Sequence, residues 1–94
     1  MEERKLADNE ILVGGKAVLA YAYTVNYLFN EKKLKEIKLK ARGKMIQKAV
    51  SLAEFVKKVN KEAKVSNIEI GSDKTQNKEK KDVFVSFIEI TLSK

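Results

Sequence analysis

The spacing of apolar residues switches along this chain between the period of a strand and the period of a helix. Residues 34 to 41, LKEIKLKA, alternate apolar with basic side chains once the phase has slipped at Lys35 and Glu36, so a half-exposed strand is expected from about there. Directly after Gly43, the apolar residues from 44 to about 61 recur at helical spacing. A strand that passes into a helix at a glycine favours a fold in which helices pack on a sheet.

The other segments complete the pattern. Residues 9 to 14 form a short apolar run that is typical of a strand, and residues 16 to 30 have helical spacing. Residues 65 to 71 and 83 to 92 are rich in the β-branched and aromatic residues of strands. The order β-α-β-α-β-β predicts an α+β fold, an α/β sandwich in which a four-stranded mixed sheet carries two helices on one face. A single domain over residues 1–94 is expected, because this length is near the usual size for one core.

Composition and charge narrow the range of partners. Apolar residues make up 44% of the chain, as expected of a folded protein, and the net charge is +7. Such a charge favours nucleic acid, an acidic membrane surface or an acidic protein, with a merely soluble basic protein as the alternative. No apolar run approaches the roughly 20 residues of a membrane span, and the acidic start MEERKLADNE is unlike a signal peptide. A cytoplasmic protein is therefore expected.

Catalytic and metal chemistry are not expected. The chain has no His, which is the commonest general base near neutral pH, and no Cys, so the usual ligands of transition metals are missing. The segment EILVGGKAV is partly similar to a phosphate-binding loop, but that motif requires Gly at Glu10 and Ser or Thr at Ala17. We therefore expect no enzyme, no catalytic residue, no metal and no cofactor.

Basic residues gather where the second predicted strand meets the second predicted helix. In KARGKMIQKAV, Lys40 and Arg42 precede Gly43, and Lys44 and Lys48 follow it. A helix start presents free backbone N–H groups that favour phosphate, and Gly43 permits a sharp turn. Arg42 can offer a forked guanidinium to phosphate oxygens, and the lysines add point charges. The set is a candidate anion site, with a solvated strand end carrying ordinary surface lysines as the alternative.

The same residues resemble the Alba family, the small basic chromatin proteins of archaea, over about residues 8 to 93. KARGKMIQKAV closely follows the family's K-A-R-G-[RK]-x-I-x-K-A-V, while NEILVGGKAV, IEIGSDK and FIEITL resemble its first strand and turn, the strand entering its hairpin, and its last strand. The resemblance implies the β-α-β-α-β-β fold and sequence-independent binding of double-stranded DNA, with coating and compaction of the chromosome. It also implies RNA binding. A main role on RNA in a ribonucleoprotein, or a basic interaction module for an acidic protein or membrane surface, are the alternatives.

The polar stretch SDKTQNKEKKD, residues 72 to 82, is too long for an ordinary hairpin turn. It resembles the extended β-hairpin arm of Alba, which at about 3.3 Å per residue would reach about 20 Å and could enter a minor groove. Asp73, Glu79 and Asp82 oppose its positive charges. A merely flexible loop is the alternative. The lysines that the arm adds to the candidate site are Lys74, Lys78, Lys80 and Lys81.

Lys16 lies at the other glycine turn, which in Alba is close to the Arg42 turn on the nucleic-acid face. The family commonly has two adjacent lysines at this turn, whereas this chain has Gly15 and Lys16, so one cation is missing. The resemblance implies that Lys16 could be acetylated, which would remove its positive charge.

The resemblance also implies a symmetric homodimer or a heterodimer with a paralogue, without a membrane partner, in a cytoplasmic, chromosome-associated protein. Leu52 and Phe55 fall beside the main apolar stripe of the second helix and leave a second apolar face to be covered. Family members also associate dimer to dimer through an aromatic residue late in this helix, where this chain has Asn60, so bridging by this chain alone is not expected. The residues expected to pack in the core or at an interface of the first helix are Tyr21, Tyr23 and Tyr27.

Overall fold

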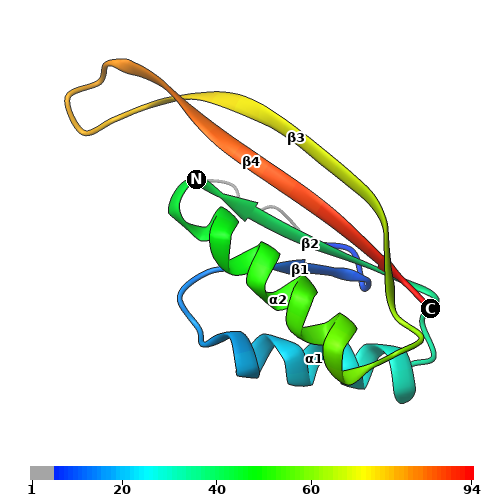
Figure 1. The fold of residues 1–94 in the computed structure, drawn as a ribbon. Coiled ribbons are helices and arrows are strands. Elements are labelled where there is room, and N and C mark those ends of the chain that lie inside the picture. The colour runs from blue at the N-terminus through cyan, green and yellow to red at the C-terminus, as the bar shows by residue number, and fades with distance from the viewer. Residues whose placement is uncertain (1–5) are drawn as a thin grey trace.

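In the computed structural model, which describes residues 6–94, four strands form one mixed sheet in the order β1-β2-β4-β3. β1 runs parallel to β2, and β4 pairs antiparallel with β2 and with β3. Both helices lie on one face of the sheet (Figure 1), so the predicted α+β fold is confirmed. The first half of the start MEERKLADNE lies outside the described residues. In chain order the elements are β1 (Glu10–Leu12), α1 (Val18–Asn30), β2 (Glu36–Arg42), a 3₁₀ turn (Gly43–Met45), α2 (Ile46–Val59), β3 (Lys64–Gln76) and β4 (Asp82–Ser93).

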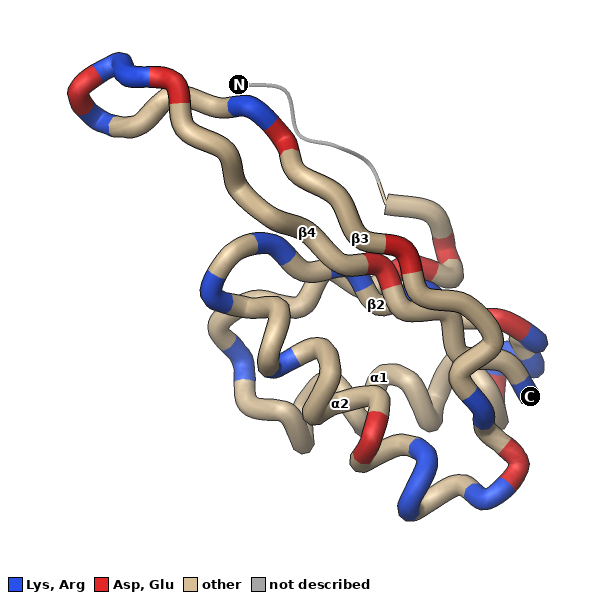
Figure 2. The backbone as a smooth tube through the Cα atoms, turned by 45° about the horizontal axis from the view of Figure 1, so that its top comes forward, with Lys and Arg blue, Asp and Glu red and all other residues tan. Residues whose placement is uncertain are grey.

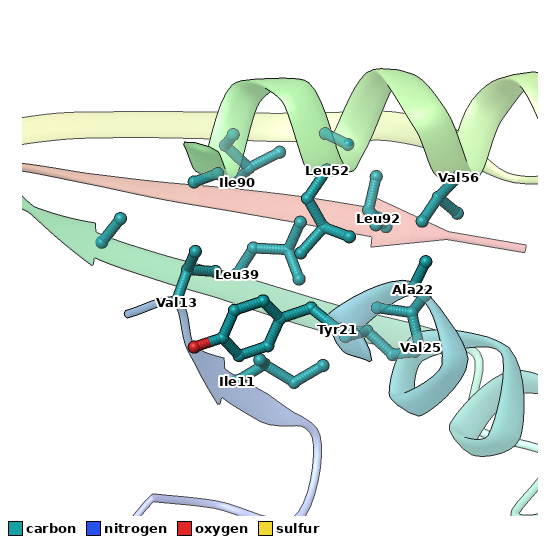
Figure 3. Packing of buried hydrophobic residues seen from close by; sticks show 14 of the residues in the cluster. Ile11, Val13, Tyr21, Ala22, Val25, Leu39, Leu52, Val56, Ile90 and Leu92 are labelled. Atoms are coloured by element: carbon teal, nitrogen blue, oxygen red, sulfur yellow. The ribbon is translucent and has the colours of Figure 1, made fainter. Parts of the chain in front are cut away.

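The core lies between the helices and the inner face of the sheet (Figure 3). In β2, Ile37 and Leu39 are fully buried and pair with Leu92 and Ile90 of β4. Because side chains alternate across a strand, Lys38 and its basic neighbours in β2 point to the opposite, open face of the sheet. The alternation of apolar and charged residues in this strand therefore gives it an apolar inner face and a charged outer face.

Both helices begin later than the spacing of apolar residues indicated. α1 begins at Val18 because Ala17 keeps an extended backbone, and the 3₁₀ turn Gly43–Met45 precedes α2. Gly43 has a φ of +53°, in the left-handed region where a side chain is strained. The glycine thus allows the sharp passage from β2 to α2 that the sequence motif predicted.

The long polar segment is a paired arm. β3 and β4 pair from Lys64 opposite Ser93 to Gln76 opposite Asp82, with one register shift between Val65 and Asn67, so the turn takes up only residues 77–81. The end predicted for β3 at residue 71 was wrong, because backbone pairing needs no apolar face where both faces of a ribbon are in solvent. The start predicted for the last strand at residue 83 agrees with the observed start at Asp82 to within one residue. The molecule is elongated, with extents of 45 × 23 × 23 Å (Figure 1). The predicted extended hairpin arm is therefore confirmed.

Local contacts give the arm a defined shape at its tip and base. At the tip, the Asn77 side-chain oxygen accepts hydrogen bonds from the backbone N–H groups of Glu79 and Lys81 at 2.9 and 3.0 Å. At the base, the Phe87 ring lies against Gly71, where a Cβ would be only 2.6 Å from a ring carbon. The tip is therefore an ordered turn, and glycine at position 71 leaves room for the aromatic ring.

Candidate nucleic-acid interface

The two glycine turns that sequence analysis singled out meet at one end of the molecule. The Lys48 ammonium on α2 donates hydrogen bonds to the carbonyl oxygens of Gly14, at 2.9 Å, and Lys16, at 2.8 Å. These contacts join the turn before α1 to the first turns of α2, although the partners are 32 to 34 positions apart in the chain. Lys16 and Lys44 are exposed there. Basic residues thus gather at the end of the molecule where both helices begin (Figure 2).

The helix starts at this end are open to an anion. Within residues 6–94, neither the start of α1 nor the start of the 3₁₀ turn that leads into α2 has a side-chain hydrogen bond as a cap, and neither first turn contains an acidic residue. Backbone N–H groups at a helix start have no partner inside the helix, and the helix dipole adds partial positive charge there. Phosphate is therefore favoured at this end both by the lysines and by the backbone.

Arg42 lies at the end of β2, where the strand passes into the glycine turn. Its Nε atom is 3.7 Å from the Asp73 carboxylate of β3, and both side chains are about half exposed. An exposed ion pair at this distance contributes little to the stability of the fold, on the order of 0–1 kcal/mol. The Arg42 guanidinium is therefore accessible to an incoming phosphate, which offers it a bidentate partner.

Lys40 lies apart from the two turns, on the open face of the sheet. Its ammonium is 2.8 Å from a Glu10 carboxylate oxygen and 3.7 Å from Glu89, which also pairs with Lys38 at 3.4 Å. The hydrogen bond from Lys40 and a second one from the Ala7 N–H hold the pKa of Glu10 below its usual value. Glu10 therefore remains ionised, and paired with Lys40, to lower pH than an isolated glutamate would.

The arm divides its lysines into two kinds. Lys74 pairs with Asp82 at 3.2 Å, and Lys81 lies 3.8 Å from Glu79. Lys78 and Lys80 form no ion pair with any residue from 6 to 94. The positive charge that the arm can offer to an anion is consequently concentrated at its tip.

Sequence analysis expected Tyr21 to pack in the core or at an interface but did not predict its polar role. The Tyr21 hydroxyl accepts hydrogen bonds from the backbone N–H groups of Gly14, at 2.7 Å, and Lys16, at 3.4 Å, while its ring is buried. A tyrosine in the first turn of a helix that follows a glycine pair was the available signal. Tyr23 and Tyr27 are exposed on the outer side of the same helix.

The described part of the chain has neither a cluster of metal ligands nor a helix suited to a bilayer. Among residues 6–94, no three His, Cys, Asp or Glu side chains lie close enough together to hold a metal ion. In the same residues, no helix is both long enough and apolar enough to span a bilayer.

The mixed four-stranded sheet, the two helices on one face and the basic hairpin arm define a small α+β protein of the Alba type, and comparisons with known proteins agree. The Alba family model matches residues 9–72, so the chain belongs to the Alba family. It is 41% identical over 88 residues to the DNA/RNA-binding protein Alba of Methanococcus maripaludis, covering 93% of this chain and 99% of the relative. It is 37% identical over 90 residues to DNA/RNA-binding protein Alba 1 of Archaeoglobus fulgidus, covering 95% and 99%. The solved structure of Alba from Thermoplasma volcanium superposes with a TM-score of 0.84 at 39% identity, covering 92% of this chain and all of that one.

Proposed function

We propose that this protein binds double-stranded DNA without sequence preference, and RNA as well, through the two joined basic turns and the arm. The single observation that carries the proposal is the Lys48 bridge, which brings the turn of exposed Lys16 to the start of α2, where exposed Lys44 lies and Arg42 ends β2. Relatives named DNA/RNA-binding protein Alba support it. The protein would coat and compact the chromosome in the cytoplasm as one Alba-like domain, without catalytic activity. Acetylation of the exposed Lys16 would weaken binding by removing a charge.

The proposed contacts are mainly to phosphate. Lysine and arginine contacts to the backbone set position and affinity but carry little sequence information. The centre of the proposed interface would consist of Arg42, Gly43, Lys44 and Lys16. Lys48 would support this centre by holding the turn that carries Lys16. Lys40, paired on the open face, would contribute at most from the flank. The residues of the arm that would reach a groove are Lys74, Lys78, Lys80 and Lys81, with the unpaired tip lysines contributing most.

We propose further that two copies associate through an apolar surface beside α2, here called the Ile70 surface and made of Ile68, Ile70, Phe84 and Val50. Ile70 is 76% exposed and Phe84 is 73% exposed in the protomer. The strand residues point to the helix side of the sheet, at the part of β3 and β4 that the helices leave uncovered. Burial of such apolar residues would favour a dimer, with a paralogue as the alternative partner. Beside this surface lies an open groove of about 400 Å³, lined by Ile46, Ile70, Gly71, Ser72, Ser86, Phe87 and Ile88.

Dimer-to-dimer bridging has less support. Asn60 follows the end of α2, and its side-chain oxygen accepts a hydrogen bond from the Glu62 N–H at 3.2 Å. A polar side chain occupied in its own turn does not offer the apolar contact that an aromatic residue would provide.

Direct titration tests the proposed function. Fluorescently labelled random-sequence duplex DNA, duplex RNA and vesicles with anionic lipid are each titrated with the protein at about 0.1 M salt. We expect binding to both nucleic acids with dissociation constants that do not depend on sequence. Binding to vesicles, with none to either nucleic acid, would overturn the proposal in favour of a membrane-directed interaction module. A strong preference for RNA over DNA would favour the ribonucleoprotein role.

Gly15→Lys is expected to strengthen DNA binding. A Cβ at this position would meet no atom within 4 Å. Among the described glycines only Gly43 has a positive φ, so Gly15 can take a side chain without strain. The added cation beside Lys16 should raise affinity by about three- to tenfold at about 0.1 M salt and steepen the log–log salt slope by about one.

Gly15→Gln is the matched control, because it adds a long polar side chain without charge. Its affinity should remain that of the parent protein in the same titration. Equal gains from the Lys and Gln variants would show that the turn does not lie at the phosphate contact.

A further inference from the structure

We infer that Lys48 and Tyr21 act as positioning residues that hold the turn Gly14–Lys16 in its binding conformation, with Lys48 acting through Lys16 rather than by touching phosphate. The inference rests on the proposed nucleic-acid function and assigns these two side chains a role within it. It concerns three segments that are distant in the sequence: the turn, the first part of α1 and the start of α2.

The polar groups of the turn are satisfied from two sides. The carbonyl oxygens of Gly14 and Lys16 both accept from the Lys48 ammonium, at 2.9 and 2.8 Å. The N–H groups of the same two residues both donate to the Tyr21 hydroxyl, at 2.7 and 3.4 Å. Each of these residues is therefore held through both its donor and its acceptor, by one side chain from each helix.

The turn needs such support because its own sequence provides little. Gly14 and Gly15 are conformationally permissive, and Ala17 at the helix start cannot cap with its side chain. Gly14 also allows the close approach, since a Cβ there would be 3.5 Å from the Tyr21 hydroxyl oxygen. Without the two helix side chains, ordering this turn would have to occur on binding, which lowers affinity.

The bonding of Lys48 argues against a direct phosphate contact. Its ammonium has three N–H donors, of which two are directed at carbonyl oxygens in a half-buried position. A phosphate that captured this ammonium would break two charge-assisted hydrogen bonds and leave both carbonyl oxygens facing an anion. Lys44, one helical turn earlier, is exposed and carries the same charge, so the two lysines make a matched pair.

The test compares Lys48→Met with Lys44→Met on one duplex over a range of salt. Lys44→Met should lower affinity and reduce the log–log salt slope by about one, as the loss of a phosphate contact does. Lys48→Met should lower affinity by about tenfold with the slope unchanged, because the number of phosphates contacted is the same. Its effect should largely vanish in a Lys16→Met background, since both changes act through the same turn.

A second readout uses the free protein. In amide hydrogen exchange by NMR, the N–H groups of Gly14 and Lys16 should exchange faster in Lys48→Met, and faster still in Tyr21→Phe, which removes only the accepting hydroxyl. Lys48→Gln, which keeps an N–H donor, should restore part of both affinity and protection. This variant and Tyr21→Phe decide the matter if Lys48→Met does not fold.

The inference is overturned if Lys48→Met reduces the salt slope by about one and leaves the exchange of Gly14 and Lys16 unchanged. Parent-like affinity in Lys48→Met would overturn it too. If the parent protein bound no nucleic acid, the proposed function would fail, and the exchange measurements would still decide whether Lys48 and Tyr21 hold the turn.

Discussion

The affinity of this protein for random-sequence duplex DNA is expected to fall about a thousandfold between about 50 and 200 mM salt. Each protomer presents Lys16, Arg42 and Lys44 at its basic end, so a dimer would engage about six phosphates. Release of the condensed counterions then gives a log–log slope of about −5, which over a fourfold change in salt amounts to about three decades. Fluorescence anisotropy titrations at several salt concentrations measure this slope directly.

Duplexes of unrelated sequence serve as the control for this prediction. All should give the same slope and similar affinities, because contacts to phosphate dominate. A nearly flat salt response would contradict the phosphate interface, and a strong dependence on sequence at fixed salt would contradict binding without sequence preference.

Ile70→Asp is expected to convert the proposed dimer into monomers and to weaken duplex binding by about a hundredfold. A carboxylate on the Ile70 surface would have to be buried without a partner, which is costly at an apolar interface. The protomer should keep its fold, because Ile70 is 76% exposed in it. The loss of affinity follows because a monomer contacts the duplex through one basic end instead of two linked ones. Light scattering after size-exclusion chromatography gives the oligomeric state, and the same titration gives the affinity.

Tyr23→Asp is the matched control. Tyr23 is 72% exposed on the outer side of α1, so the same charge is introduced on an apolar surface that lies elsewhere. We expect this variant to remain dimeric. If Ile70→Asp also remains dimeric at micromolar concentration, the Ile70 surface is not the interface and another face of the protein must be considered.

The sequence was sufficient for the order of elements and for the inner face of the sheet. Alternation through β2 predicted which side chains would be buried, because a strand exposes every second residue to one face. The same alternation could also have separated Lys40 from the helix side of the sheet. Alternation does not reveal the ion-pair partners of Lys40, because Glu10 and Glu89 are brought next to it by the pairing of β2 with β1 and β4.

Other features depend on contacts that no local pattern contains. Lys48 falls on the same helical face as Lys44 by spacing, yet its ammonium is occupied by carbonyl groups more than thirty residues away. The end of β3 was predicted too early for a different reason: a polar ribbon lacks the apolar periodicity that marks strands in a sequence. Its pairing is carried by backbone hydrogen bonds, which are the same for polar and apolar residues.

The side-by-side starts of α1 and α2, joined by Lys48, have a consequence for stability. Each helix carries a partial positive charge of about half an elementary charge at its N-terminus, and here two such ends and several cations share one small region. In the free protein these like charges repel one another, which destabilises the folded state modestly. A bound polyanion removes that repulsion, so part of its free energy of binding stabilises the folded state. The protein bound to nucleic acid is therefore more resistant to unfolding than the free protein.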